Sequence, residues 1–155
     1  MTHHELMQRA IELSVQNVQQ GGGPFGAVIA RHGEVLAEGV NRVTANHDPT
    51  AHAEVQASRE AARRLGTFDL TGCDIYASCE PCPMCLGAIY WARLDHLYYA
   101  ATQHDAAGAG FDDAFIYHEL ALDPKERSLS TQQLLHGEAL QAFDDWRDKE
   151  DRTDY

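Results

Sequence analysis

The feature that most constrains the fold of this chain is the pattern Pro-Cys-Pro-Met-Cys at residues 81–85. Proline favours the first position of a helix, because it has no N–H group to leave unpaired and its φ angle is already fixed. Pro83 therefore predicts a helix with Cys82 as its N-cap residue and Cys85 in its first turn. Both sulfur atoms would lie at the positive end of the helix dipole, which favours the thiolate form.

A second pattern, His-x-Glu at His52 and Glu54, comes earlier by about one helix and one strand. Residues two apart do not share a face in the middle of a helix. Both side chains can therefore reach one site only from a first turn, where side chains lean toward the helix N-terminus. Thr50 is a suitable N-cap residue for such a helix. We expect two helices whose N-termini converge on one site.

One histidine and two cysteines form a ligand set for Zn²⁺. Three protein ligands leave the fourth position to water, as in a catalytic site. The predicted ligands of one Zn²⁺ per chain are His52, Cys82 and Cys85. Two alternatives remain. One is a structural zinc site completed by Cys73 or Cys79, and the other is an iron–sulfur centre on the Cys-x2-Cys-x2-Cys run, which no fourth cysteine follows.

A carboxylate beside such a centre predicts hydrolytic chemistry. Zinc lowers the pKa of bound water to about 7, so a nucleophile is available at neutral pH. A neighbouring acid that is not a ligand can accept the proton and pass it to the substrate. Glu54 is the predicted acid. The expected reaction replaces an amino group on a ring carbon next to C=N by a carbonyl and releases ammonia.

Hydrophobic periodicity and turn residues predict alternating helices and strands. The predicted helices are 5–19, 51–65, 83–93 and 137–151, with a short helical or irregular piece at 115–120. The predicted strands are 25–31 and 34–39, joined in a hairpin by His32-Gly33, and 74–78 and 96–100. The last two strands flank a helix and are expected to be parallel. Residues 21–24 are predicted to be a flexible connector and 105–113 a loop.

Composition limits the class of partner. The chain has 155 residues, 24 acidic against 12 basic, and a formal net charge of −12, which argues against a nucleic-acid substrate. The four cysteines are clustered, which argues against a disulfide framework. No basic-then-apolar leader or long apolar run is present, so we expect a soluble, cytoplasmic protein that does not contact membranes. The length predicts one domain over residues 1–155.

These motifs carry a resemblance to the cytidine deaminase-like zinc-dependent deaminases, on His52-Ala53-Glu54 and residues 81–85. More narrowly, the chain is similar to the small bacterial guanine deaminases. The stretches that carry this likeness are 22–28 (GGPFGAV), 46–54 (NHDPTAHAE), 79–93 (CEPCPMCLGAIYWAR) and 109–113 (AGFDD). The likeness is weakest from about residue 124 to 138.

The resemblance implies an α/β fold, a three-layer α/β/α sandwich around a central five-stranded mixed sheet. It also implies hydrolysis of guanine to xanthine and ammonia in purine catabolism. A homodimer is implied, in which the C-terminal segment, about 137–155, is exchanged and closes the partner's site. The substrate-contacting residues that it implies are Asn41, an aromatic pair of Phe25 and Trp91, Asp113 with Asp112 as second choice, Ala53, and Tyr155 reaching into the other subunit.

Three other functions stay open at this point. A tRNA adenosine deaminase would share the metal motif, although the net charge argues against it. Another small amino-heterocycle or nucleoside, such as guanosine, cytosine or an aminotriazine, could be the substrate. A non-catalytic zinc-stabilised binding module would have a fourth protein ligand and no need for Glu54.

Overall fold

The computed structural model describes all 155 residues, in two compact units, Met1–Tyr117 and His118–Tyr155. The first unit carries a mixed four-stranded sheet with strand order β2-β1-β3-β4. Strands β1 (Gly26–Arg31) and β2 (Glu34–Val40) form the predicted hairpin, and its two turn residues have the positive φ angles of a tight two-residue turn. Strand β3 (Cys73–Cys79) pairs antiparallel with β1 and, as predicted, parallel with β4 (His96–Ala101).

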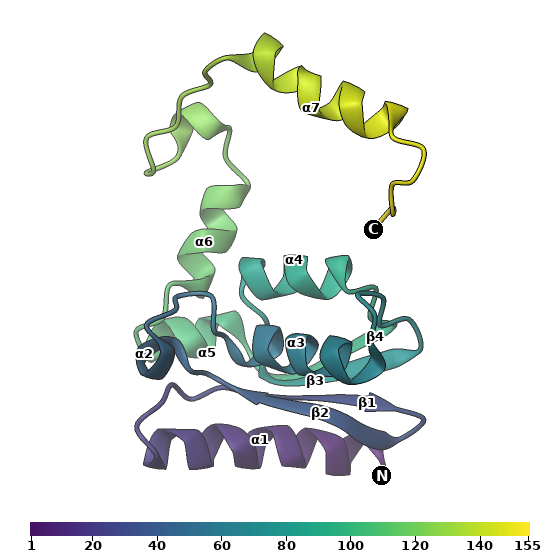
Figure 1. The fold of residues 1–155 in the computed structure, drawn as a ribbon. Helices are drawn as coiled ribbons and strands as arrows, with labels where there is room; N and C mark the ends of the chain where they lie inside the picture. The colour runs from purple at the N-terminus through teal and green to yellow at the C-terminus, as the bar shows by residue number, and fades with distance from the viewer. The chain divides into compact units, whose positions relative to one another are not determined.

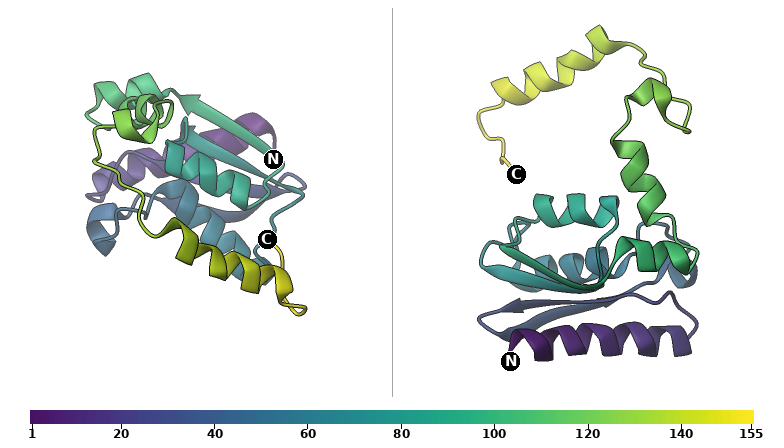
Figure 2. Two further views of the ribbon diagram at one scale, coloured as in Figure 1. Left: turned by 90° about the horizontal axis from the view of Figure 1, so that it is seen from above. Right: turned by 180° about the vertical axis from the view of Figure 1, so that it is seen from behind.

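Helices cover both faces of this sheet. Helix α1 (His3–Gln19) lies on one face, and α3 (Ala53–Leu65) and α4 (Pro83–Trp91) lie on the other (Figure 1). The buried strand β1 separates two apolar cores, because its side chains alternate between the faces. Val28 packs with residues of α1, and Ile29 packs with residues of α3. The three-layer α/β/α arrangement is confirmed, and the view from behind in Figure 2 shows the same layers.

The prediction of a five-stranded sheet is wrong, because the chain becomes helical directly after β4. Thr102 caps helix α5 (Gln103–Gly108), and its hydroxyl and the Asp105 carboxylate each accept a hydrogen bond from the other residue's backbone N–H. The predicted loop at 105–113 therefore begins with a helical turn. Helix α6 (Asp113–Leu120) follows, and β4 remains an edge strand.

The remaining helices are short or exposed. Helix α2 (Val43–Asn46) follows β2. The second unit contains the 3-10 turn Pro124–Glu126 and helix α7 (His136–Asp148), which lies close to the predicted range and has no buried residue. None of the helices combines the length and apolar character needed to cross a membrane.

Candidate metal centre and substrate pocket

The N-termini of α3 and α4 meet, as the two motifs predict. Cys82 is the N-cap residue of α4, Pro83 is its first residue, and Cys85 lies in the first turn. The prediction that Thr50 caps α3 is wrong, because His52 is the N-cap residue. Thr50 instead donates its backbone N–H and its hydroxyl to Asp48, at 2.9 and 2.7 Å, in a turn that delays the start of the helix.

The three predicted ligands form one compact group. The Nδ1 atom of His52 lies 3.4 Å from the Cys82 sulfur and 3.5 Å from the Cys85 sulfur, and the ligand atoms of all three lie within 4.8 Å of one another. One imidazole and two sulfur atoms suit Zn²⁺. Neither Cys73 nor Cys79 belongs to the group. A metal bound here would have three protein ligands, which leaves the structural-zinc alternative without a fourth.

The hydrogen bond between the two cysteines shifts the pKa values of their thiols in opposite directions. The bond with Cys85 lowers the pKa of Cys82 to about 4, and the same interaction raises the pKa of Cys85. The contact with Cys82 also raises the pKa of His52. A thiolate at Cys82 is favoured further by its place at a helix N-terminus, whose dipole favours negative charge.

Glu54 lies beside the group but is not a member of it. It is in the first turn of α3, with 7% of its surface exposed. Burial raises its pKa to about 7, because a charged carboxylate is poorly solvated there. A carboxyl group that titrates near neutral pH can both accept and return a proton.

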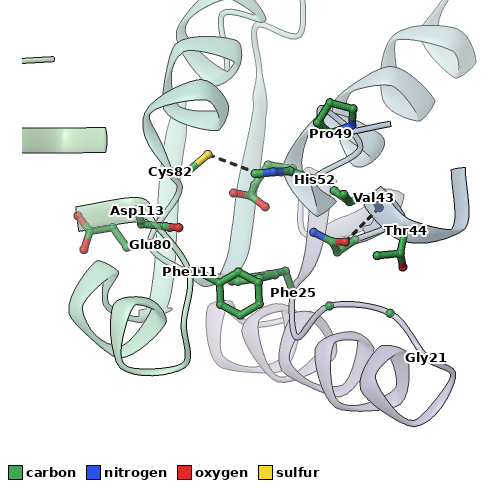
Figure 3. A pocket seen from close by; sticks show the side chains of 14 residues that line it. Gly21, Phe25, Val43, Thr44, Pro49, His52, Glu80, Cys82, Phe111 and Asp113 are labelled. Carbon is green, nitrogen blue, oxygen red and sulfur yellow. Dashed lines mark hydrogen bonds between the residues drawn. The ribbon is translucent and has the colours of Figure 1, made fainter. Parts of the chain in front are cut away.

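His52, Glu54 and Cys82 are among the residues that line a cavity of about 440 Å³ (Figure 3). It brings together residues from the segment after α1, both ends of the hairpin, α2, the start of α3, the turn before α4 and the start of α6. Its lining residues are Gly21, Gly22, Gly23, Phe25, Asn41, Val43, Thr44, Pro49, His52, Glu54, Glu80, Cys82, Phe111 and Asp113. The volume suits a small planar ligand.

Three predicted substrate-contacting residues line this cavity, namely Phe25, Asn41 and Asp113. The Asn41 carboxamide oxygen accepts a hydrogen bond from the Val43 N–H at 3.1 Å. Partial burial raises the pKa of Asp113.

Of the other predicted contacts, Trp91 and Ala53 belong to the first unit. Trp91 ends α4, is 64% exposed and does not line the cavity. Ala53 is fully buried and is also absent from the lining. Tyr155 belongs to the second unit, and its contact with the site of the other subunit stays a prediction.

Phe111 and Glu80 are among the lining residues that were not predicted as contacts. Phe111 meets Phe25 edge to face, with ring centroids 4.8 Å apart. Phe111 stands in the AGFDD stretch, and an aromatic residue close to the predicted contact Asp113 is the sequence signal that could have indicated it. Glu80, next to the cysteine motif, accepts hydrogen bonds from Gln103 at the start of α5, 3.0 Å from its backbone nitrogen and 3.3 Å from its side-chain amide.

The fold and the site together indicate which class of enzyme this chain represents. A His/Cys/Cys group at two converging helix N-termini, with a buried acid outside the ligand set, is the arrangement of a zinc-dependent hydrolytic deaminase. Residues 1–101 match the family described as the cytidine and deoxycytidylate deaminase zinc-binding region, and the chain belongs to that family.

Individual relatives give a finer comparison. The chain is 50% identical to the guanine deaminase of Bacillus subtilis strain 168, over the full length of both. The X-ray structure of guanine deaminase from B. subtilis matches with a TM-score of 0.96, covering 100% of this chain and 99% of that one. A guanine deaminase structure from Nitrosomonas europaea matches at 34% identity and a TM-score of 0.70, over 72% of this chain and 65% of that one. A tRNA-specific adenosine deaminase of Aquifex aeolicus is 40% identical over 58% of this chain and 60% of its own.

Proposed function

We propose that this chain hydrolyses guanine to xanthine and ammonia. The single observation that carries the proposal is the buried Glu54 carboxyl, which lies beside the three-membered ligand group at the edge of a purine-sized cavity. The full-length identity of 50% to a guanine deaminase supports the choice of base.

His52, Cys82 and Cys85 would hold one Zn²⁺, which supplies Lewis acidity that makes water a nucleophile at neutral pH. Glu54 accepts a proton from the attacking water and delivers it to a ring nitrogen next to the reacting carbon. The C–O bond forms at the carbon that carries the amino group. Glu54 then takes the remaining proton from the added hydroxyl group and passes it to the amine. The C–N bond breaks as the carbonyl forms, and ammonia leaves. The pKa of about 7 suits both directions of transfer.

A planar nucleobase in this cavity would find both apolar and polar contacts. The Phe25 and Phe111 rings give aromatic surface, which suits a planar ligand. The Asp113 carboxylate can accept from two N–H groups of guanine. The raised pKa of Asp113 reflects burial, and pairing with such donors would offset that cost.

A homodimer that exchanges residues 137–155 is the second part of the proposal, with residues 1–155 acting as one deaminase domain. It is supported by α7, whose apolar residues Leu140, Phe143 and Trp146 are all exposed. Such a face favours a protein partner. Trp91 and Tyr155 would then contact substrate in a site built from two subunits. A cytoplasmic location also stays a prediction.

Ammonia release across a panel of bases tests the reaction. Guanine should be the preferred substrate over guanosine, cytosine and an aminotriazine, and adenosine in tRNA should give no inosine. Glu54→Gln should reduce ammonia release by at least about 10²–10⁴-fold while zinc content stays near one per chain. Activity that survives this substitution would refute the mechanism, and preference for another substrate would refute the choice of guanine.

Mixed dimers test the exchange. A Glu54→Gln chain and a chain that lacks residues 137–155 should each be inactive alone. Mixing them should restore activity, because the truncated chain keeps its Glu54 and receives the other chain's C-terminal segment. No recovery in a mixture that forms dimers would contradict the exchange.

A further inference from the structure

Asn17 is a buried amide at the end of α1, and nothing in the chemistry above uses it. Only 6% of its surface is exposed, on a helix whose other buried residues are mostly apolar. Its side-chain Nδ2 donates two hydrogen bonds to backbone carbonyls, to Gly23 at 2.7 Å and to Asn41 at 2.9 Å. Both acceptor residues line the cavity. A single amide thus joins two segments of the cavity wall.

Gly22 lies so close to the Asn17 amide that only glycine fits at this position. The Gly22 N–H donates to the Asn17 carbonyl at 2.8 Å. A Cβ atom at Gly22 would lie 2.8 Å from both Cγ and Oδ1 of Asn17 and closer still to its Nδ2, which is too close for any side chain. The segment predicted as a flexible connector is therefore fixed against α1, and its glycines allow the close approach.

Asn41 is fixed from three sides. Asn17 donates to its carbonyl, its own N–H donates to Phe25 O at 3.2 Å, and its side-chain oxygen accepts from Val43. A Cβ at Gly23 would lie 3.1 Å from the Asn41 Cγ, so glycine at this position leaves the space that the Asn41 side chain occupies. The Asn41 Nδ2 group has no hydrogen-bond partner in the chain and is left to donate to a ligand.

We propose that Asn17 is a positioning residue for base recognition. It fixes the backbone of Gly23 and Asn41, so that Asn41 Nδ2 meets a hydrogen-bond acceptor on the purine. This inference rests on the proposed function, because it assumes a purine in the cavity. Asn17 does not touch the substrate. Its loss should weaken binding of the base more than it slows the chemical step.

Asn17→Asp tests this with little change of shape. The carboxylate cannot donate to the two carbonyls, so the wall loses both bonds. A displaced Asn41 would lose its hydrogen bond to the base, and a bond of about 1.4 kcal/mol corresponds to a tenfold change in affinity. We therefore expect KM for guanine to rise about tenfold and kcat to fall less. Gln16→Glu introduces the same charge at the exposed neighbouring position and should leave both constants unchanged.

A binding measurement separates this role from the reaction. In a Glu54→Gln background, where turnover is blocked, calorimetry should show that Asn17→Asp weakens guanine binding by the same factor as KM. Guanine binding that Asn17→Asp leaves unchanged would overturn the positioning role alone. If the chain with Asn17 intact does not bind guanine, the proposed function itself is overturned.

Gly22→Ala gives a second route that keeps Asn17 in the chain. The added methyl should displace the Asn17 amide and raise KM as Asn17→Asp does. In an Asn17→Ala background the space is vacated, so Gly22→Ala should then have less than a third of its effect on KM. Equal effects of Gly22→Ala in the two backgrounds would overturn the inferred contact, and so would a loss of thermal stability with KM unchanged.

Discussion

Replacing Gly39 by alanine should damage the metal centre from the opposite side of helix α3. Gly39 lies in β2 where α3 crosses the sheet. An added Cβ would lie 2.5 Å from the backbone nitrogen of Ala57 and closer still to the carbonyl oxygen of Ala53. Ordinary contacts begin at 3.4 Å, so one of the two backbones must move by about 1 Å. Ala53 stands between His52 and Glu54, so movement of this helix displaces a ligand and the catalytic acid together.

The size of the effect follows from that displacement. Overpacking of a close-packed core costs about 1–3 kcal/mol of the free energy of unfolding. A misplacement of about 1 Å in catalytic groups costs roughly 10²-fold in rate. We therefore expect Gly39→Ala to lower kcat/KM for guanine by about two orders of magnitude, measured by ammonia release, and to lower stability in urea unfolding by the stated amount.

Gly87→Ala is the matched control. Gly87 lies within α4, and a Cβ there meets nothing within 4 Å. This substitution should leave kcat/KM unchanged and raise helix stability by up to about 1 kcal/mol. The reasoning is refuted if Gly39→Ala destabilises the fold while kcat/KM stays at the wild-type value, because the sheet contact would then not control the alignment of α3.

Three further predictions concern the surroundings of the site. Chelation should abolish ammonia release, lower the melting temperature and expose the two ligand cysteines to a thiol reagent, while the fully buried Cys73 stays protected; unchanged labelling would contradict the assigned ligands. Burial raises the pKa of Cys79 to about 12 from 9.0, so above pH 9 the unfolded chain loses a proton that the folded chain keeps. The free energy of unfolding should fall by at most about 1.4 kcal/mol per pH unit in this range, and Cys79→Ala should reduce that slope in urea titrations. Tyr117→Phe removes a 2.5 Å hydrogen bond to the carbonyl of Pro81 and should cost about 1–3 kcal/mol in urea unfolding, with zinc content unchanged; a stability equal to wild type would argue against this bond.

Much of the site could be predicted because its residues are adjacent in the sequence. The proline after Cys82 identifies a helix start, and the short spacing places Cys85 in the first turn, which the structure confirms. The hairpin followed from the two residues His32-Gly33, whose turn geometry is local. Local backbone chemistry was sufficient in each case.

The errors arose where two local signals compete or where a contact is long-range. Thr50 is a residue type that often caps helix N-termini, but Asp48 holds it in a preceding turn, so the helix begins later. The Ala- and Gly-rich segment after β4 suggested a loop, although the capping pair of Thr102 and Asp105 was readable there. The meeting of Phe111 with Phe25 joins residues far apart in the chain, which periodicity cannot reveal.

The caps of α3 and α4 have a consequence for the evolution of this centre. Neither His52 nor Cys82 makes the side-chain cap hydrogen bond that a serine or aspartate would supply, a bond generally worth about 1 kcal/mol. Replacing His52 or Cys82 by a residue that caps a helix better would stabilise the helix but remove a metal ligand. The two positions are therefore held by function against the direction in which selection for robustness alone would move them.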